Sequence, residues 1–349
     1  MSGPVPGRVL VIPLRRLGDC LLTTPLLRRL HESVPSARVD VLVEAGARRV
    51  FEGNPACSEI LEYDPRSAAA WIRRVRARRY DWVIDVLSNP RSALISALSG
   101  APERAGFSVP FWGRTYTVPV VRGAVPEYAA SAKMRLLEGL ALRAGVPLRR
   151  GSLDSEFHTT PEDEACARDW LDSMPGGRQG PLIALVPTHR RSVRRWTARG
   201  FAGLARLLEE HLGARVFLAW GPGEEGQRDE VLSQAAGSLV PLPPLSLGRM
   251  AALFRSCGLV IANDNGPRHL AAAMGTSTLT VFGPTRPGDW NPPGDARHAS
   301  LGVPGLNCLG CNLNRCPYGH ECMNWLGPEA VFRAACRALG RSPAAVLNP

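Results

Sequence analysis

Residues 260–293 read VIANDNGPRHLAAAMGTSTLTVFGPTRPGDWNPP, and this stretch decides the fold class. The apolar, β-branched run Leu259–Ala262 is typical of a buried parallel strand. Turn residues follow it, and Pro267 suits the first turn of a helix because the N–H that proline lacks would have no partner there. A second strand is expected over 278–282. The predicted helix therefore begins at the carboxyl end of a buried strand, where its free N–H groups favour an anion such as a diphosphate.

The turn before this helix also holds a carboxylate. Asp264 would repel a phosphate unless it caps the helix or binds a hydroxyl group of the ligand. An ordinary capped helix in an α/β sheet, without any ligand, fits the same residues. The stretch alone leaves both interpretations open.

Strand and helix patterns alternate through both halves of the chain. The alternation begins with an apolar run at 8–14 and restarts with another at 182–186. Residues 146–180 differ in character, with a Pro/Gly/Arg-rich start, an acidic patch and a turn-rich end, so they read as a linker. We predict two doubly wound α/β domains, residues 1–165 and 180–349, with ligands bound in the cleft between them.

The composition is that of a globular protein with a strong positive charge. The 349 residues are 45% hydrophobic and 21% charged, and the formal net charge is +11. Lys133 is the only lysine, so arginine supplies nearly all of the positive charge. This charge suits nucleic acid, an anionic membrane surface or small anionic substrates. Scattered arginines and an aromatic content of 6% weigh against nucleic acid, which is not an expected partner.

Two sequence features bear on the compartment. The first 19 residues show no signal-peptide pattern, and no apolar run is long enough to cross a bilayer. A cytoplasmic location is therefore expected.

A short polar turn, Arg15–Asp19, follows the first predicted strand. Gly18 would let the backbone pass close to a ligand. Asp19 lies where the next helix begins, so it is either an N-cap or a general base that takes a proton from an acceptor hydroxyl. The spacing alone favours the cap.

A basic loop follows the first strand of the second predicted domain. Within residues 188–196, the guanidinium groups of Arg194 and Arg195 could neutralise a diphosphate leaving group. A solvated basic loop is the alternative.

Residues 221–226, GPGEEG, satisfy the glycine pattern of a dinucleotide site. The carboxylate that should hold the ribose is missing from 232–252, and Glu224 and Glu225 would repel a pyrophosphate, so an NAD site is disfavoured. Glu225 could instead bind nucleoside hydroxyls, or it could be a first-turn carboxylate that the helix dipole favours.

Four cysteines cluster near the C-terminus as C-x2-C-x4-C-x5-C: Cys308, Cys311, Cys316 and Cys322. In a cytosolic protein such spacing favours a metal over disulfides, and His320 could replace one ligand. Four thiolates would leave no open coordination position, so a zinc ion here would be structural. Free thiols are the alternative.

Two stretches resemble the signatures of glycosyltransferase family 9, the heptosyltransferases. The first is RLGDCLLTTPLL at 16–27, and the second is NDNGPRHLAAA at 263–273 with FGPT at 282–285 and Trp290. The cysteine cluster with Met323 is also similar to that of many members. The resemblance covers nearly the whole chain and implies a GT-B fold, in which two Rossmann-like domains enclose a cleft.

The resemblance further implies an activity and roles for particular residues. The activity would be inverting, metal-independent transfer of heptose from ADP-heptose to the lipopolysaccharide inner core, with no cofactor needed for catalysis. Asp19 would be the general base, with Arg16 and Gly18 on the acceptor side. The donor site would comprise Arg194, Arg195, Glu225, Asp264, Asn265, Gly266 and His269.

The chain departs from the family pattern at two points. Asn265 stands where members often have Ser or Thr, and Arg194 and Arg195 precede Trp196 where they commonly have lysine, which bears on the identity of the donor. A family 9-like transferase with another sugar nucleotide or acceptor is therefore an alternative. A polyanion-binding or nucleic-acid-binding protein with cysteine-bound zinc is an alternative of another class.

Three partners follow from the resemblance. They are a nucleotide-sugar donor, a lipopolysaccharide core acceptor, and the cytoplasmic face of the inner membrane, touched by the basic helix predicted over 68–78.

Overall fold

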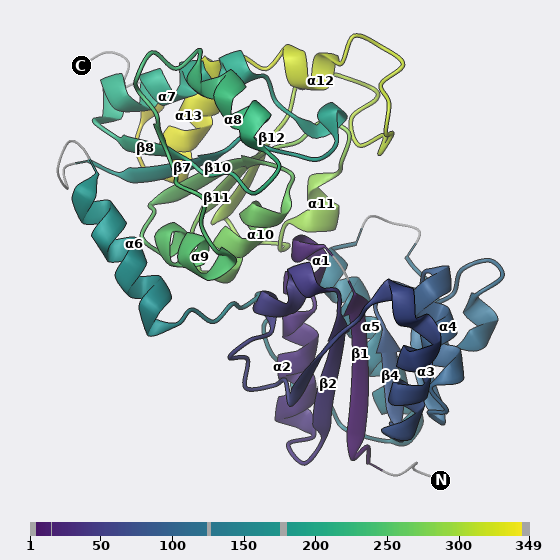
Figure 1. The fold of residues 1–349 in the computed structure, drawn as a ribbon. Helices are drawn as coiled ribbons and strands as arrows, with labels where there is room; N and C mark the ends of the chain where they lie inside the picture. Colours follow the sequence, from purple (N-terminus) through teal and green to yellow (C-terminus); the bar gives the residue numbers. More distant parts are fainter. Residues whose placement is uncertain (1–4, 15, 124–126, 175–179, 344–349) are drawn as a thin grey trace. The chain divides into compact units, whose positions relative to one another are not determined.

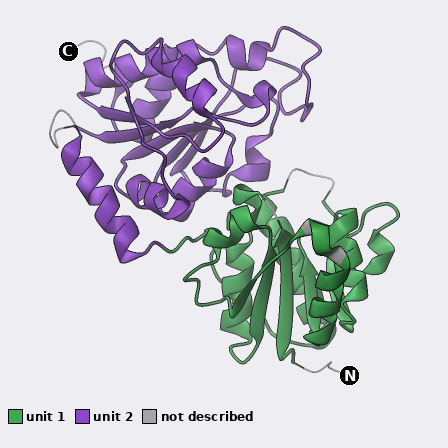
Figure 2. Ribbon diagram, viewed as in Figure 1, with its two compact units in different colours: residues 1–158 green, residues 159–349 purple. Residues whose placement is uncertain are grey.

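The structure is a computed structural model that describes residues 5–14, 16–123, 127–174 and 180–343. The chain forms two compact units, residues 1–158 (unit 1) and 159–349 (unit 2), which are described one at a time (Figure 2). Arg15 of the predicted polar turn and part of the predicted turn-rich segment, 175–179, lie outside the described residues.

Unit 1 is built on a six-stranded parallel sheet with the strand order β3-β2-β1-β4-β5-β6 (Figure 1). The strands are β1 (Arg8–Leu14), β2 (Arg38–Val43), β3 (Glu59–Glu62), β4 (Trp82–Asp85), β5 (Glu103–Phe107) and β6 (Val118–Val120). The α-helices are α1 (Leu17–Leu21), α2 (Thr24–Ser33), α3 (Ala68–Ala77), α4 (Pro90–Leu98) and α5 (Ala129–Ala144). Short 3-10 turns are η1 (Ala45–Val50), η2 (Pro65–Ser67) and η3 (Gly113–Thr115).

Strand β1 has apolar side chains on both faces of the sheet, so both faces have to be covered by helices. Leu10 and Ile12 join a buried cluster with Trp71 of α3 and Ile95 of α4. Val11, which points to the opposite face of the pleat, is also fully buried. Helices α2 and α5 pack against each other, and α5 also contacts β4, β5 and β6. A strand buried on both faces reads as a continuous apolar run, as β1 does.

Unit 2 repeats the same topology with the order β12-β11-β10-β7-β8-β9. The strands are β7 (Leu182–Val186), β8 (Arg215–Leu218), β9 (Val240–Pro241), β10 (Leu259–Asn263), β11 (Thr278–Val281) and β12 (His298–Leu301). The helices are α6 (Pro161–Ser173), α7 (Ala198–Leu212), α8 (Glu225–Leu232), α9 (Leu247–Arg255), α10 (Gly266–Ala273), α11 (Pro287–Trp290), α12 (Glu321–Asn324) and α13 (Pro328–Ala338), with the 3-10 turn η4 (Ser192–Arg194).

The core of unit 2 joins its sheet to the helices on one face. Ile183 and Leu185 of β7 pack with Phe201 of α7 and Phe332 of α13. Helix α9 contacts both α6 and α10 (Figure 1). The acidic patch that the sequence analysis placed in a linker is the first turn of α6, where a capping box on Thr160 and the helix dipole favour carboxylates.

Both sheets have the 3-2-1-4-5-6 order of a doubly wound fold, so the predicted fold class is confirmed. The order reverses between β1 and β4 in unit 1 and between β7 and β10 in unit 2. Ligands of such folds bind outside the carboxyl ends of the strands at this switch point. Asp19 follows β1, and the residues at 263–269 follow β10. Among the described residues, no helix is long and apolar enough to cross a membrane.

Candidate functional site

The start of helix α10 holds several of the predicted donor-site residues. Asn265 is the N-cap: its Oδ1 accepts a hydrogen bond from the Arg268 N–H at 3.1 Å. Its Nδ2 donates to the Thr188 carbonyl at 2.9 Å. One side chain therefore caps α10 and ties it to the loop after β7. The first turn begins at half-buried Gly266 and presents its N–H groups at the carboxyl end of β10.

Asp264 does not cap the helix but pairs with an arginine. Its Oδ2 accepts a hydrogen bond from Arg194 Nη1 at 3.2 Å, and the Asp264 side chain is only 5% exposed. The same guanidinium donates through Nη2 to Asn312 Oδ1 at 3.0 Å. The carboxylate that seemed to oppose an anion is thus neutralised, and a guanidinium stands beside the start of α10.

The two neighbouring arginines point to different surroundings. Arg195 donates from Nε to the His189 carbonyl at 2.6 Å. It lines a cavity of about 260 Å³ together with Gln227 and Glu230 of α8. Arg194 alone contacts Asp264, so the structure separates two residues that the sequence analysis assigned to one diphosphate.

The imidazole of His189 lies in the same loop. Burial, followed by the positive charge of Arg194, lowers the pKa of His189 to about 4. Its Nδ1 accepts the Arg191 N–H at 2.8 Å. This histidine is therefore neutral at physiological pH and adds no charge to the arginine loop.

His269, one turn into α10, is held by residues that carried no assigned role. Its ring packs edge-on against Trp290 with the centroids 5.8 Å apart. Arg268 is fully buried and places Nη2 3.0 Å from His269 Nε2, while Nη1 donates to Asn291 Oδ1 at 2.7 Å. Arg268 could have been noticed in the sequence as an arginine on the buried face of a helix made mostly of small, apolar residues.

Glu225 lies apart from the residues around α10. It is the exposed first residue of α8, and its Oε1 accepts the Gly223 N–H at 3.2 Å. Glu224, the residue before it, accepts the Gly221 N–H at 2.9 Å. Both carboxylates satisfy backbone groups of the glycine turn, and the Glu225 side chain remains accessible to a ligand hydroxyl.

In unit 1, Asp19 lies in the first turn of α1 beyond the end of β1. The N-cap is Arg16, with φ 76° and no side-chain cap, so Asp19 is not a capping residue. Its carboxylate is 23% exposed. Gly18 precedes it inside the helix and is half-buried, while Arg16 is exposed. Gly18 and Asp19 therefore lie within α1, and Arg16 immediately precedes it.

Lys133 of α5 holds this helix in place. Its Nζ donates to the Asp19 carbonyl at 2.5 Å and lies 3.6 Å from Asp19 Oδ1. Burial lowers the pKa of Lys133 from its ordinary value, while the carboxylate of Asp19 opposes that shift. Local sequence patterns predict no role for Lys133, which stands out only as the single lysine of an arginine-rich chain.

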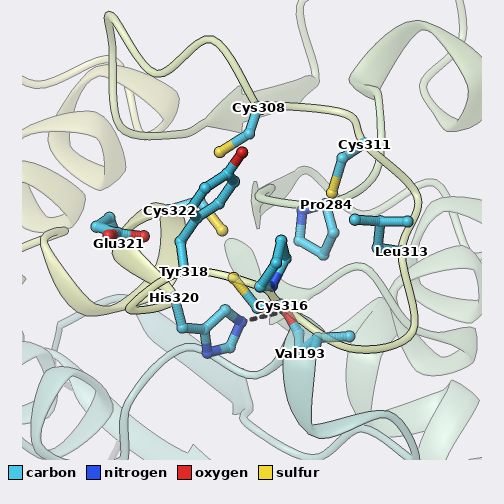
Figure 3. Close-up of a pocket in the computed structure, with 11 residues that line it drawn as sticks. Val193, Pro284, Cys308, Cys311, Leu313, Cys316, Tyr318, His320, Glu321 and Cys322 are labelled. Carbon is cyan, nitrogen blue, oxygen red and sulfur yellow. Dashed lines mark hydrogen bonds between the residues drawn. The ribbon is translucent and has the colours of Figure 1, made fainter.

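The four clustered cysteines line one cavity of about 30 Å³ with Val193, Pro284 and His320 (Figure 3). All four are free thiols; Cys322 is buried and Cys311 is exposed. Burial raises the pKa of Cys322 to about 11, and the other three cysteines add to the shift. The imidazole of His320 makes a different contact from the metal ligation considered for it: its Nε2 lies 2.6 Å from the Val193 carbonyl oxygen.

Two doubly wound units are the architecture of the GT-B fold. Comparison with known proteins specifies the family. Residues 68–320 match the model of glycosyltransferase family 9 (heptosyltransferase), and the chain belongs to that family. It is a glycosyltransferase, and a polyanion-binding protein is not favoured.

Relatives span most of the chain. Lipopolysaccharide heptosyltransferase 1 of Pseudomonas aeruginosa is 27% identical over 335 residues, covering 89% of this chain and 88% of its own length. The protein of that name from Escherichia coli O18:K1:H7 is 25% identical over 303 residues, covering 80% and 87%. The crystal structure of a family 9 glycosyltransferase from Veillonella parvula superposes with a TM-score of 0.80 at 22% identity, covering 95% of this chain and 97% of that one.

Proposed function

We propose that the protein transfers heptose from ADP-heptose to the inner core of lipopolysaccharide, with inversion at the anomeric carbon and without a catalytic metal. Family membership and the names of the relatives support the sugar and the acceptor. The observation that carries the mechanism is the partly exposed carboxylate of Asp19 at the switch point of unit 1, with its backbone fixed by Lys133.

In this mechanism Asp19 is the general base. Its carboxylate takes the proton of the acceptor hydroxyl as that oxygen forms a bond to the anomeric carbon. The bond between the anomeric carbon and the diphosphate oxygen breaks, and ADP leaves with the electron pair. Because the nucleophile enters opposite the leaving group, the configuration inverts.

The donor site uses unit 2. Backbone N–H groups at the start of α10 and the guanidinium of Arg194 neutralise the leaving diphosphate. Asn265 fixes that helix start, and His269 faces the sugar side beside Trp290. Glu225 holds ribose hydroxyls. Arg195 supports the loop through the His189 carbonyl and is not proposed as a phosphate contact, in contrast to the assignment from sequence.

The donor is the part of the proposal most open to a direct test. The full-length protein is incubated with ADP-heptose, and separately with ADP-, GDP- and UDP-hexoses, in the presence of a heptose-free lipopolysaccharide acceptor. We expect ADP release and a product heavier by one heptose with ADP-heptose only, and NMR of the product should show inverted anomeric configuration. Preferential use of a GDP- or UDP-sugar would overturn the donor assignment, and a retained configuration would overturn the mechanism.

We also propose that the protein works at the cytoplasmic face of the inner membrane. The net charge of +11 favours anionic lipid, and Arg73 and Arg76 of α3 are exposed. Phe111, on another loop of unit 1, is 93% exposed. Sedimentation with vesicles should show binding to anionic but not to zwitterionic lipid, and equal binding to both would contradict an electrostatic contact.

A further inference from the structure

Helix α11 has no apolar anchor of its own. It is a single turn of four residues, Pro287–Trp290, and none of these four residues is buried. One turn of helix is unstable in water by itself, because its hydrogen bond does not offset the entropy of ordering the backbone. Contacts from other elements must therefore hold this turn in place.

A buried guanidinium supplies these contacts. Arg268 of α10 is fully buried, and it donates through Nη2 to the Trp290 carbonyl at 3.0 Å and through Nη1 to Asn291 Oδ1 at 2.7 Å. Asn291 in turn donates to the His298 carbonyl at 2.9 Å, at the start of β12. The end of α11 is therefore attached to α10 by Arg268 and to β12 by Asn291 (Figure 1).

The same guanidinium also determines the charge of His269. Its Nη2 lies 3.0 Å from His269 Nε2 and 3.3 Å from Nδ1. A guanidinium has donors only, so at least one ring nitrogen has to accept, which an imidazolium with protons on both nitrogens cannot do. The imidazole is therefore neutral in this arrangement, and it packs edge-on against Trp290.

Helix α11 also lies beside the charged residues at the start of α10. Burial raises the pKa of Asp289, while Arg286 opposes that shift and the carboxylate of Asp264 adds to it. Trp290, the next residue of α11, contacts His269. Two successive residues of α11 therefore lie near two residues of the proposed donor site.

Stability alone does not account for a charged side chain at position 268. Burying a guanidinium costs free energy, and an apolar side chain of similar volume is often as stabilising or more so. The next two residues of α10, Leu270 and Ala271 after His269, are fully buried and apolar. An apolar residue in place of Arg268 could not hydrogen-bond to α11 and to His269 at the same time.

We propose that Arg268 is a positioning residue of the donor site: it keeps His269 neutral and holds α11, so that His269 and Trp290 together form the wall that contacts the transferred sugar. It acts through these two residues and makes no contact with the diphosphate. The role of the wall rests on the proposed function, whereas the attachment of α11 and the charge of His269 do not.

The first test needs no substrate. In Arg268→Met, hydrogen exchange of residues 287–291 should speed up by at least about tenfold. The Asn291 N–H donates to the Pro287 carbonyl at 2.8 Å, and this bond should open once α11 is released. Exchange at the start of α10 should stay the same, since the backbone N–H at position 268 still binds the N-cap. Arg199→Met, the same change at an exposed site of α7, is the control. Unchanged exchange in residues 287–291 would contradict the proposal.

A second measurement uses the native protein, so it does not depend on a variant that folds. Nitrogen NMR of labelled histidine side chains distinguishes a neutral imidazole, whose two nitrogens differ, from an imidazolium, whose nitrogens are alike. The signal of His269 is identified by its loss in His269→Asn. At about pH 6, where an unperturbed imidazole is mostly protonated, we expect a neutral ring.

The surroundings of the ring make this measurement specific. The charged groups around the first turn of α10 are Asp264, Asp289, Arg194, Arg268 and Arg286. The two carboxylates favour a charged ring, so a neutral ring reports the guanidinium that lies against it. An imidazolium at His269 would overturn the proposal.

The last test separates this role from nucleotide binding. With ADP-heptose as donor, Arg268→Met should lower kcat/KM by about 10²-fold, while ADP alone, measured by calorimetry, should bind within about threefold of the native affinity. Arg268→Lys, which keeps a charge and a donor, should recover part of the rate. Equal losses of ADP affinity and of transfer, together with a lower melting temperature, would show a purely structural role and refute the positioning role. If the native protein transfers no heptose while exchange and NMR behave as expected, the proposed function fails and the attachment of α11 by Arg268 stands.

Discussion

Asp19 in unit 1 and Asp264 in unit 2 occupy comparable places, because each follows a strand that flanks the switch point of its sheet. The two units treat these carboxylates differently. Asp264 is 5% exposed and shares a hydrogen bond with the guanidinium of Arg194. Asp19 is 23% exposed, and the buried ammonium of Lys133 both donates to its backbone carbonyl and lies 3.6 Å from its carboxylate Oδ1.

The difference separates two uses of one position in the fold. A buried carboxylate that is paired with a guanidinium orients that guanidinium and has little freedom to accept a proton. A carboxylate whose backbone is fixed while its oxygens stay accessible can accept one from a substrate. In the proposed mechanism, unit 1 supplies the base and unit 2 supplies charge stabilisation.

The largest expected effect tests the accessible carboxylate. Asp19→Asn keeps the shape of the side chain and removes its basicity, so kcat should fall by about 10²- to 10⁴-fold. The affinity for ADP, measured by calorimetry, should stay within about twofold, because Asp19 has no role in the donor site. Asp264→Asn is the matched variant, and we expect it to change donor affinity more than kcat. The reverse pattern would exchange the two roles.

The next effect separates the neighbouring arginines. Arg194→Ala removes a charged hydrogen-bond donor and should weaken ADP binding by about 10- to 100-fold, equivalent to about 1.5–3 kcal/mol. Arg195→Ala should weaken ADP binding by less than about threefold, since Arg195 contacts the His189 carbonyl and lines a cavity beside α8.

A control is needed because Arg194→Ala also leaves a buried carboxylate without its cation. The double variant R194A/D264N removes both charges and should recover thermal stability without recovering ADP affinity. If affinity returns with stability, Arg194 acts only by supporting Asp264 and does not contact the diphosphate.

A smaller effect tests how Asp19 is held. Lys133→Met keeps an apolar stem in the buried site but removes both the donor to the Asp19 carbonyl and the cation beside its carboxylate. We expect kcat to fall about tenfold with donor KM unchanged. Lys133→Arg should restore part of the rate. The pKa of Lys133 is lowered by burial, so the native enzyme should lose activity on the alkaline side as the ammonium deprotonates, and the arginine variant should not. If the native enzyme and Lys133→Arg lose activity equally at alkaline pH, the charge of Lys133 has no role and the residue serves only in packing.

The fold class could be predicted from the sequence because the buried strands leave a clear pattern in it. Parallel strands buried on both faces give continuous apolar runs, as at 8–14 and 182–186, and these runs alternate with amphipathic helices. The start of α10 was predicted from turn chemistry between Asn263 and Pro267. The sequence also indicated the cysteine cluster, because its four members lie within fifteen residues of one another.

Contacts between distant segments could not be predicted in this way. Lys133 meets Asp19 across 114 positions, and Asn312 meets Arg194 across 118. No local pattern specifies such pairs, since tertiary packing of separate helices and loops brings them together. The same limit explains why Arg194 and Arg195 looked equivalent. Adjacent residues can make different contacts, and the backbone geometry decides which contacts each one makes.

The smallest predicted effect extends the comparison to the stability of the two units. Burial raises the pKa of Asp85, at the end of β4 in unit 1, to about 6, and burial lowers the pKa of His189 in unit 2 to about 4. Between pH 4 and 6, unfolded unit 1 releases the proton that folded Asp85 retains, so stability falls as pH rises through this window. In the same window unfolded unit 2 binds a proton that folded His189 excludes, so stability rises with pH.

The two slopes have opposite signs and can be removed separately. Asp85→Asn should reduce the fall in stability with rising pH. His189→Asn, whose amide oxygen can still accept the Arg191 N–H, should reduce the rise in stability with pH. Each substitution should remove about 2 kcal/mol from the change in the free energy of unfolding between pH 4.5 and pH 7. Calorimetric melting of the full-length protein at these two pH values measures both. If the two variants shift the pH dependence in the same direction, the charge states assigned to Asp85 and His189 cannot both be right, because a buried acid and a buried base respond oppositely to the same change in pH.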